Sequence, residues 1–147
     1  MQEKNELISF DISPNDIAAM SPTVLAFIGD TVYDLFIRTN TITENRGDIN
    51  KMHRIAVSMV NAHAQSVALH RIEQHLTEQE QSIFKRGRNA KSGVPKNADV
   101  LEYRAATGLE CLIGYLYLNK EYRRLNEIMN LILINTKDEA SKHDITD

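Results

Sequence analysis

The sequence lacks the residues that disulfide frameworks and membrane spans require. Cys111 is the only cysteine in 147 residues, which excludes an internal disulfide and a zinc site built from cysteines. No stretch approaches about 18 consecutive apolar residues, so we expect no membrane-spanning helix. The polar, acidic start Met-Gln-Glu-Lys-Asn-Glu does not fit a secretory signal. These absences favour a cytoplasmic protein in which Cys111, among apolar neighbours, is a buried and inert thiol.

An overall excess of positive charge is also missing. The net charge is −3 and the pI is about 5.9, which alone does not indicate a nucleic-acid-binding protein. Phosphate binding, however, needs only a local basic patch. One lies in residues 81–98, a segment without any acidic residue, and its basic members are Lys85, Arg86, Arg88, Lys91 and Lys96.

Capping residues and apolar spacing predict one all-α domain over residues 1–147, with no strand pattern. Serine followed by proline, at 13–14 and at 21–22, is a frequent helix start, and apolar residues then recur every three or four positions. Residues 86–96 are expected to lack regular structure, and residues 136–147 to form a flexible, frayed tail. The first expected helix begins at residue 14, and the second runs from 22 to about 40. The third follows the cap Asp48 to about residue 74, and the fourth runs from a capping box at Thr77 to 84. The fifth begins at the cap Asn97 and continues past residue 110, and the last runs from 121 to 134.

Two apolar helical segments each contain one carboxylate. Residues 24–37 contain Asp30, and residues 108–118 contain Glu110. A carboxylate inside an apolar segment is unfavourable unless it has a partner, and hard oxygen ligands of this kind suit Mg²⁺. The two residues are eighty positions apart, so only the fold can bring them together. We therefore expect them to share a divalent cation.

The helix that contains Asp30 is apolar on more than one side. Phe27 and Tyr33 share the side of Asp30, which suggests that another helix or subunit covers it. A solvated acid is the alternative, and Arg38 could neutralise Asp34 one turn on. The predicted core face of this helix, at roughly 100° per residue, consists of Val24, Leu25, Ile28, Val32, Leu35 and Phe36.

Small residues flank Glu110 on its own helix. Ala106 and Gly114 lie one turn before and after it, and glycine inside a helix costs up to about 1 kcal/mol relative to alanine. Close approach of another backbone, an ion or a phosphate would explain Gly114. A buried glutamate paired with a tyrosine hydroxyl is the alternative.

Three motifs, in this order, resemble the ribonuclease III family. Residues 26–32, Ala-Phe-Ile-Gly-Asp-Thr-Val, are similar to its Glu-Phe-Leu-Gly-Asp-Ser signature, and residues 47–52, Gly-Asp-Ile-Asn-Lys-Met, to its Gly-Asp-Met segment. Residues 108–118 are similar to its Glu-Ala-Leu-Ile-Gly-Ala-Ile-Tyr-Leu segment. We expect no double-stranded-RNA-binding domain after this region, which spans about residues 16–134. Together with Phe-Lys-Arg-Gly-Arg-Asn-Ala-Lys at residues 84–91, this resembles the stand-alone bacterial subfamily called Mini-ribonuclease III.

The resemblance implies a ribonuclease III catalytic-domain-like helical bundle. It further implies a two-fold homodimer that cleaves double-stranded RNA with Mg²⁺ in the maturation of large-subunit (23S) ribosomal RNA. Asp30 and Glu110 are the implied catalytic and metal-binding residues. The larger enzymes carry glutamate where Ala26 stands and aspartate where Thr107 stands, so two of the family's four acids remain here. Fewer carboxylates leave more water around an ion, and whether one or two ions act stays open.

The expected chemistry is hydrolysis of a phosphodiester. It needs a nucleophilic water, neutralised phosphoryl oxygens and help for the departing 3′ oxygen, all of which Mg²⁺ can supply. The basic residues of segment 81–98 would hold the RNA backbone without reading its sequence.

Two other functions stay open at this point. One is an all-α Mg²⁺-dependent nucleotide pyrophosphohydrolase, although neither acid has an acidic partner three positions on. The other is a non-catalytic helical dimer that binds RNA or protein.

Overall fold

The fold is built only from helices in the part that the structure describes. The computed structural model describes residues 8–90 and 93–145, and side chains as far as residue 134. Every regular element there is an α-helix or a 3-10 turn, which confirms the all-α prediction. None of these described helices is both long enough and apolar enough to span a bilayer.

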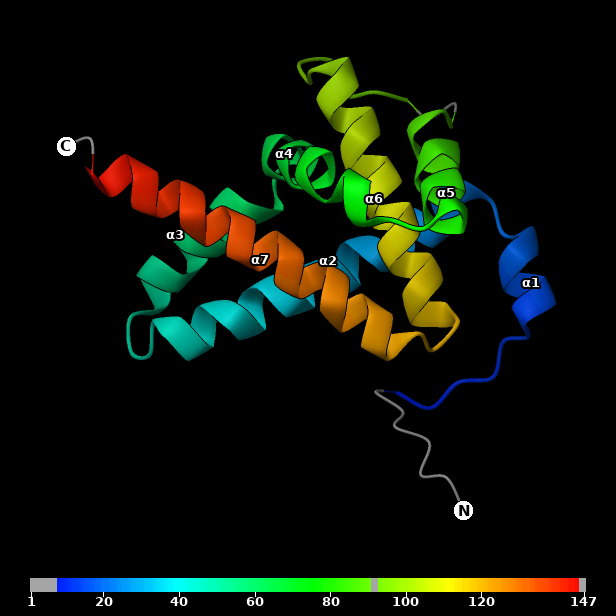
Figure 1. Ribbon diagram of the computed structural model, residues 1–147, viewed down its shortest axis with the longest axis horizontal. Helices are drawn as coiled ribbons and strands as arrows, with labels where there is room; N and C mark the ends of the chain where they lie inside the picture. The colour runs from blue at the N-terminus through cyan, green and yellow to red at the C-terminus, as the bar shows by residue number, and fades with distance from the viewer. Residues whose placement is uncertain (1–7, 91–92, 146–147) are drawn as a thin grey trace.

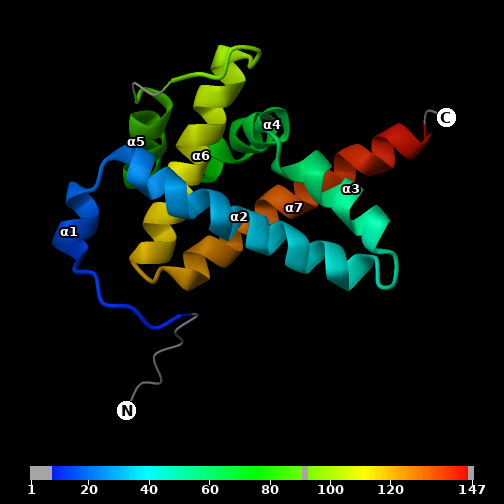
Figure 2. The ribbon, with the colours of Figure 1, turned by 180° about the vertical axis from the view of Figure 1, so that it is seen from behind.

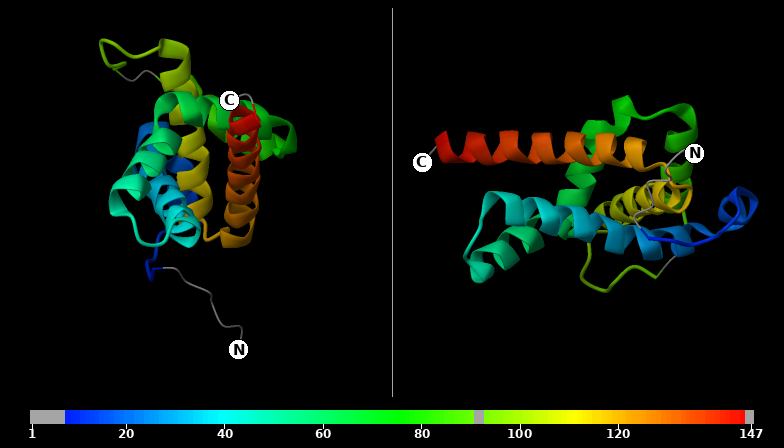
Figure 3. Two further views of the ribbon diagram at one scale, coloured as in Figure 1. Left: turned by 90° about the vertical axis from the view of Figure 1, so that its left-hand side faces the viewer. Right: turned by 90° about the horizontal axis from the view of Figure 1, so that it is seen from below.

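Helix α6 lies at the centre of the bundle. It packs against α2, α4, α5 and α7, and the views in Figure 3 place α2 and α7 on opposite sides of it. Figure 2 shows α2 crossing in front of α6, with α5 beside the N-terminal half of α2. The elements, labelled in Figure 1, are α1 (Pro14–Ala19), α2 (Pro22–Glu44), α3 (Ile49–Val60), α4 (Ala62–Ile72), the 3-10 turn η1 (Glu73–His75), α5 (Glu78–Arg88), α6 (Val100–Leu118) and α7 (Tyr122–Ile145).

Side-chain caps begin the helices largely where the sequence predicts them. The hydroxyls of Ser13 and Ser21 accept from backbone N–H groups three residues on, and each precedes a proline in the first turn. The Asp48 carboxylate accepts from the N–H of Lys51 at 3.1 Å. Thr77 forms the predicted capping box with Glu80, in which each side chain accepts from the other's backbone N–H. These four starts are confirmed.

Three helix boundaries differ from the sequence prediction. The long helix expected from 49 to 74 is broken at Asn61, whose side chain caps α4 by accepting from Ala64 N–H at 2.9 Å. Helix α6 begins behind Asp99 rather than Asn97, because the Asp99 carboxylate accepts from Glu102 N–H at 2.9 Å. Helix α5 runs on to Arg88, so part of the segment expected to be irregular is helical.

Two helices also end later than predicted. Helix α2 continues to Glu44 instead of ending near residue 40. Helix α7 continues to Ile145 instead of ending at residue 134, so residues 136–145 of the expected tail have helical backbone. The side chains of this segment, and residues 146–147 altogether, lie outside the described residues.

The core face of α2 is only partly the predicted one. Leu25 and Val32 are buried as expected, but Val24 and Leu35 are about half exposed. Tyr33, on the side that we expected another helix or subunit to cover, is buried, and its hydroxyl contacts Met59 of α3. The difference at Val24 and Leu35 arises because α2 is apolar on more than one side, and its neighbours α6 and α3 cover only part of it.

Glycines set the distance between the central helices. A Cβ added to Gly29 would lie 1.7 Å from the carbonyl oxygen of Glu110, and one added to Gly114 would lie 1.9 Å from that of Leu25. A Cβ added to Gly108 would likewise lie 2.6 Å from the carbonyl oxygen of Phe84 in α5. Of the three explanations for Gly114, the approach of another backbone is therefore the one observed.

Arg124 joins α7 to the start of α5. Its guanidinium donates to both carboxylate oxygens of Glu80 at 2.9 Å, to the carbonyl of His75 and to Glu127. Burial raises the pKa of the Glu80 carboxyl, but the bonds from Arg124 and from the backbone of Thr77 outweigh it and hold that pKa below its usual value. The ion pair thus fixes the outer helices around α6.

Replacing Gly114 by alanine should prevent α2 from reaching α6. The added methyl group would overlap backbone, which cannot turn aside as a flexible side chain can, so we expect a loss of about 4 kcal/mol or more. The measurement is the free energy of unfolding in urea. Gly93→Ala is the matched control, because no atom lies within 4 Å of its added Cβ. Equal unfolding midpoints for the two variants would show that the glycine contact is unimportant.

Candidate active site

Asp30 and Glu110 share a pocket between α2 and α6. The pocket has a volume of about 340 Å³ and opens on one side of the helix pair. Asp30 is exposed at its edge, and Glu110 is half-buried. The structure thus brings together the two carboxylates that the sequence separates by eighty positions. The pocket is lined by Thr23, Ala26, Phe27, Asp30 and Thr31 of α2 and by Tyr103, Thr107 and Glu110 of α6.

The glycine contact explains why the two carboxylates meet. Gly29 precedes Asp30 and lies against the carbonyl of Glu110, while Gly114 follows Glu110 by one turn and lies against Leu25. Because the two backbones touch at these points, the neighbouring side chains open onto the same pocket. The local backbone therefore places both acids.

The electrostatics of this pocket are unfavourable for two negative charges. Burial raises the pKa of Glu110 to about 7, the negative charge of Asp30 adds to the rise, and the side chain of Gln65 partly offsets it. The pKa of Tyr33 is also raised, first by burial and then by the charge of Glu110. The tyrosine hydroxyl donates to the carbonyl of Met59 at 3.4 Å rather than to Glu110. The alternative of a glutamate paired with a tyrosine hydroxyl is thus not what the structure shows.

The two carboxylates fit a divalent cation of the Mg²⁺ type. Mg²⁺ is commonly bound by one or two carboxylates, with water and substrate phosphate completing its shell. Within residues 8–90 and 93–145 there is no group of three or more acidic, histidine or cysteine side chains that could enclose a metal. An ion held between Asp30 and Glu110 would relieve the repulsion that raises the pKa of Glu110.

Ala26 and Thr107, the positions at which the resemblance noted above would place acids, line the same pocket. The hydroxyl of Thr107 donates to the carbonyl of Tyr103 at 3.0 Å, so it is already used within α6. Asp34 lies outside the residues that line the pocket. The Arg38 guanidinium donates to both of its carboxylate oxygens at 2.9 and 3.1 Å, as the plainer interpretation of Asp34 predicts.

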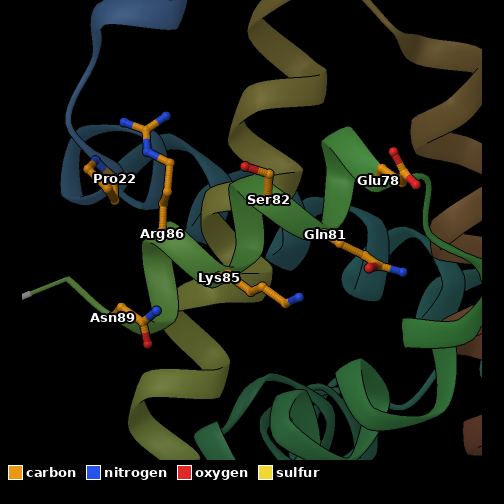
Figure 4. A pocket seen from close by; sticks show the side chains of 7 residues that line it. All are labelled: Pro22, Glu78, Gln81, Ser82, Lys85, Arg86 and Asn89. Atoms are coloured by element: carbon orange, nitrogen blue, oxygen red, sulfur yellow. The ribbon is translucent and has the colours of Figure 1, made fainter.

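The predicted RNA-binding residues occupy the end of α5 and the loop that follows. Lys85 and Arg86 are exposed and line a shallow hollow of about 740 Å³, in which Arg86 reaches toward Pro22 while Lys85 points away from it (Figure 4). The Cβ of Arg88 lies 3.5 Å from a Cβ built on Gly108, two residues before Glu110. Lys96 is exposed in the loop before α6, and Lys91 lies outside the described residues. The basic end of α5 therefore adjoins the helix turn that contains Glu110.

Sequence reasoning missed Gln65, a third polar residue of the site. Its side chain is 2% exposed, and its amide nitrogen makes no hydrogen bond in the described structure. It lies in α4, which packs on α6, and it acts on the Glu110 carboxylate. The signal was present in the sequence, because Gln65 is a polar residue within an otherwise apolar helix face, as Asp30 and Glu110 are.

Comparison with known proteins gives consistent matches along the chain. The model of the Ribonuclease III domain family matches residues 23–121. A Mini-ribonuclease 3 of Clostridium tetani is 46% identical over 136 residues, which cover 91% of this chain and 89% of the relative. A Mini-ribonuclease 3 of Thermoanaerobacter is 45% identical over 82% of this chain and 85% of the relative. A crystal structure of a Fusobacterium nucleatum protein superposes with a TM-score of 0.73 at 33% identity, covering 82% of this chain and 98% of that one.

Glu110→Gln should stabilise the fold at high pH. A carboxyl whose pKa is raised on folding binds more protons in the folded state, so the wild type loses stability as pH rises from about 4.5 toward 7. The amide does not ionise, and at pH 8 we expect it to gain about 2–3 kcal/mol, a gain that shrinks toward zero near pH 4. The measurement is urea unfolding at several pH values. The exposed Glu121→Gln is the control, and a gain independent of pH would contradict the buried charge at Glu110.

Proposed function

Since this chain belongs to the ribonuclease III family and, within it, to the Mini-ribonuclease 3 proteins, we propose that it cleaves double-stranded RNA with Mg²⁺ held by Asp30 and Glu110. Family membership makes it an endoribonuclease of the ribonuclease III type, which sets aside the non-catalytic dimer and the nucleotide pyrophosphohydrolase. The metal, the catalytic residues, the natural RNA and the oligomeric state are our proposal.

One observation carries the assignment of the site. Two acids from distant segments face one pocket, and burial together with the charge of Asp30 raises the pKa of Glu110 to about 7. A fold that needed no cation there would be more stable with neutral side chains at these positions. The pair is therefore best explained as a ligand set for a divalent ion.

In the mechanism, each carboxylate has a distinct place. Bound Mg²⁺ would supply charge neutralisation at the scissile phosphate and an activated water. Asp30, exposed at the edge of the pocket, is accessible to a duplex that approaches from outside. Glu110, the more buried of the two, would hold the ion in its deprotonated form. With Ala26 and Thr107 in the remaining positions of the wall, water would fill more of the ion's shell than in a four-carboxylate site.

The basic end of α5 would position the duplex over this pocket. Arg88 packs beside Gly108, so phosphates that it holds would lie near the carboxylates. Lys85 and Arg86 extend the contact along the hollow next to Pro22, and we propose that Lys91 and Lys96, further along the chain, add to it. Contacts of this kind fix the position of the backbone and do not read sequence. As the natural duplex we propose a precursor of 23S ribosomal RNA, which such an enzyme would meet in the cytoplasm.

A second copy of the chain would cover the outer face of α2. Phe27 is 80% exposed although it borders the pocket, and Val24, Leu35 and Ile42 lie about half exposed on the same side of the helix. Apolar side chains gathered in one stripe mark an interaction surface. A two-fold homodimer formed through this stripe would bring two pockets and two basic helix ends to one duplex.

Asp30→Asn and Glu110→Gln should each abolish cleavage of duplex RNA in Mg²⁺. Each removes one of only two anionic ligands, and we expect the rate to fall by about 10³-fold or more. The measurement is single-turnover cleavage of a duplex, compared with single-stranded RNA and with chelator present. Asp34→Asn is the control, since Arg38 pairs with that residue outside the pocket. A variant that cleaves at a near-normal rate would remove its residue from the site.

Replacing Arg86 and Arg88 together by alanine should weaken RNA binding in a salt-dependent way. Each lost phosphate contact lowers the slope of log affinity against log salt by about one, so we expect a decrease of about two. Binding is measured with duplex RNA in chelator, which prevents cleavage. Arg123→Ala, on the exposed surface of α7, is the matched control. An unchanged slope would show that the two arginines do not contact phosphate.

Phe27→Asp should convert a dimer to a monomer. A charge at the most exposed residue of the apolar stripe would have to be buried unpaired in the interface, which is strongly unfavourable. Sedimentation velocity gives the mass of each form. Val57→Asp places the same charge at another exposed apolar residue, on α3 rather than α2, and should leave the dimer intact. A monomeric wild type would refute the interface.

A further inference from the structure

Gln65 has a buried donor that makes no full hydrogen bond in the fold. The side chain is 2% exposed, and its Nε2 atom has no hydrogen-bond partner among the described residues. Buried amide groups in native proteins nearly always have a partner, and one that does not weakens the fold. A residue kept in this state calls for an explanation other than packing.

The surroundings of Gln65 identify the group on which it acts. It lies at the end of the first turn of α4, and its neighbours on the same helix face, Ala68, Leu69 and Ile72, are buried apolar residues. Helix α4 packs on α6, and the Gln65 side chain lies close enough to the Glu110 carboxylate to lower the pKa of that group, without the geometry of a full hydrogen bond. The pocket that Glu110 lines includes no residue of α4. Gln65 thus approaches Glu110 from the core, behind the side that would meet substrate.

The break at Asn61 gives Gln65 this position. Asn61 ends α3 and caps α4, and the N–H of Gln65 makes the first full-turn bond of the new helix, to the Asn61 carbonyl at 3.0 Å. The break therefore starts a helix whose first buried side chain is Gln65. The cap and the amide belong to one local arrangement.

We propose that Gln65 is a positioning residue: its amide completes a hydrogen bond to Glu110 when that carboxylate ligates the divalent cation, and so holds the carboxylate oriented toward the ion. This rests on the proposed function, because it assumes that Glu110 is a metal ligand. Amide and carbonyl groups behind ligating side chains commonly fix their orientation, and their loss weakens metal binding by about 10–100-fold. With Ala26 and Thr107 in place of acids, Glu110 is one of two ligands, so its orientation matters more here than in a site with four.

The test is Gln65→Met, which keeps the length and apolar bulk of the side chain and removes the donor. We expect Mg²⁺ to bind about tenfold more weakly, measured without RNA as the Mg²⁺ concentration that half-saturates the rise in melting temperature. The Mg²⁺ concentration needed for half-maximal cleavage should increase by the same factor. Binding of duplex RNA in chelator should not change. Gln79→Met is the matched control. The Gln79 amide donates to the hydroxyl of Tyr115 at 2.9 Å, and neither residue lines the pocket.

A second variant keeps the test decisive if the Gln65→Met protein does not fold. Gln65→Asn keeps an amide but withdraws it by one methylene group, and it should weaken Mg²⁺ binding in the same direction by a smaller factor. Unchanged Mg²⁺ binding in the folded variants, or a lower melting temperature without weaker Mg²⁺ binding, would overturn the positioning role and leave Gln65 a packing residue. Glu110→Gln separates this outcome from failure of the proposed function. If Mg²⁺ stabilises that variant as much as the wild type, the metal site itself is wrong.

Discussion

The contact between α2 and α6 at Gly29 and Gly114 determines where the two acidic side chains of the pocket lie. At each glycine the backbone of one helix occupies the space that a side chain would need, so the helices pack backbone to backbone. The acids next to these glycines, Asp30 and Glu110, then open onto one pocket. Helix α5 repeats the arrangement through Gly87 and Gly108, which brings its basic end beside α6. The acidic side chains of the pocket and the basic end of α5 are thus placed by the same kind of helix contact.

Function and stability oppose each other at this contact. The half-buried Glu110 lies close to a second negative charge, and none of the described residues that line the pocket is positively charged. The fold tolerates this because strong interactions lie elsewhere. Among them are the buried pair of Arg124 with Glu80 and the apolar side chains that α6 buries against its neighbours. Such a distribution is expected of an enzyme, in which the site is the least stable part of a well-packed structure.

Much of the helix pattern could be predicted from sequence because local chemistry determines it. Serine before proline, Asp48 and the capping box at Thr77 each satisfy backbone N–H groups within one turn, whatever the rest of the chain does. The break at Asn61 could not be predicted, because apolar residues continue at helical spacing across it and no glycine or proline marks it. The faces of α2 were ambiguous for a related reason: both sides are apolar, and only the position of α6 decides which is buried. The position of Gln65 follows from the break at Asn61, so its polar side chain is visible in the sequence but its approach to Glu110 is visible only in the folded chain.

The contact between the two helices and the lining of the pocket are formed by different residues. Gly29 and Gly114 admit no side chain at all, whereas Ala26 and Thr107 line the pocket. The charge of the pocket lining can therefore change by substitution without altering the glycines that hold the backbones of Asp30 and Glu110 together. Protein design can in this way treat the packing of the two helices and the electrostatics of the pocket as separate variables.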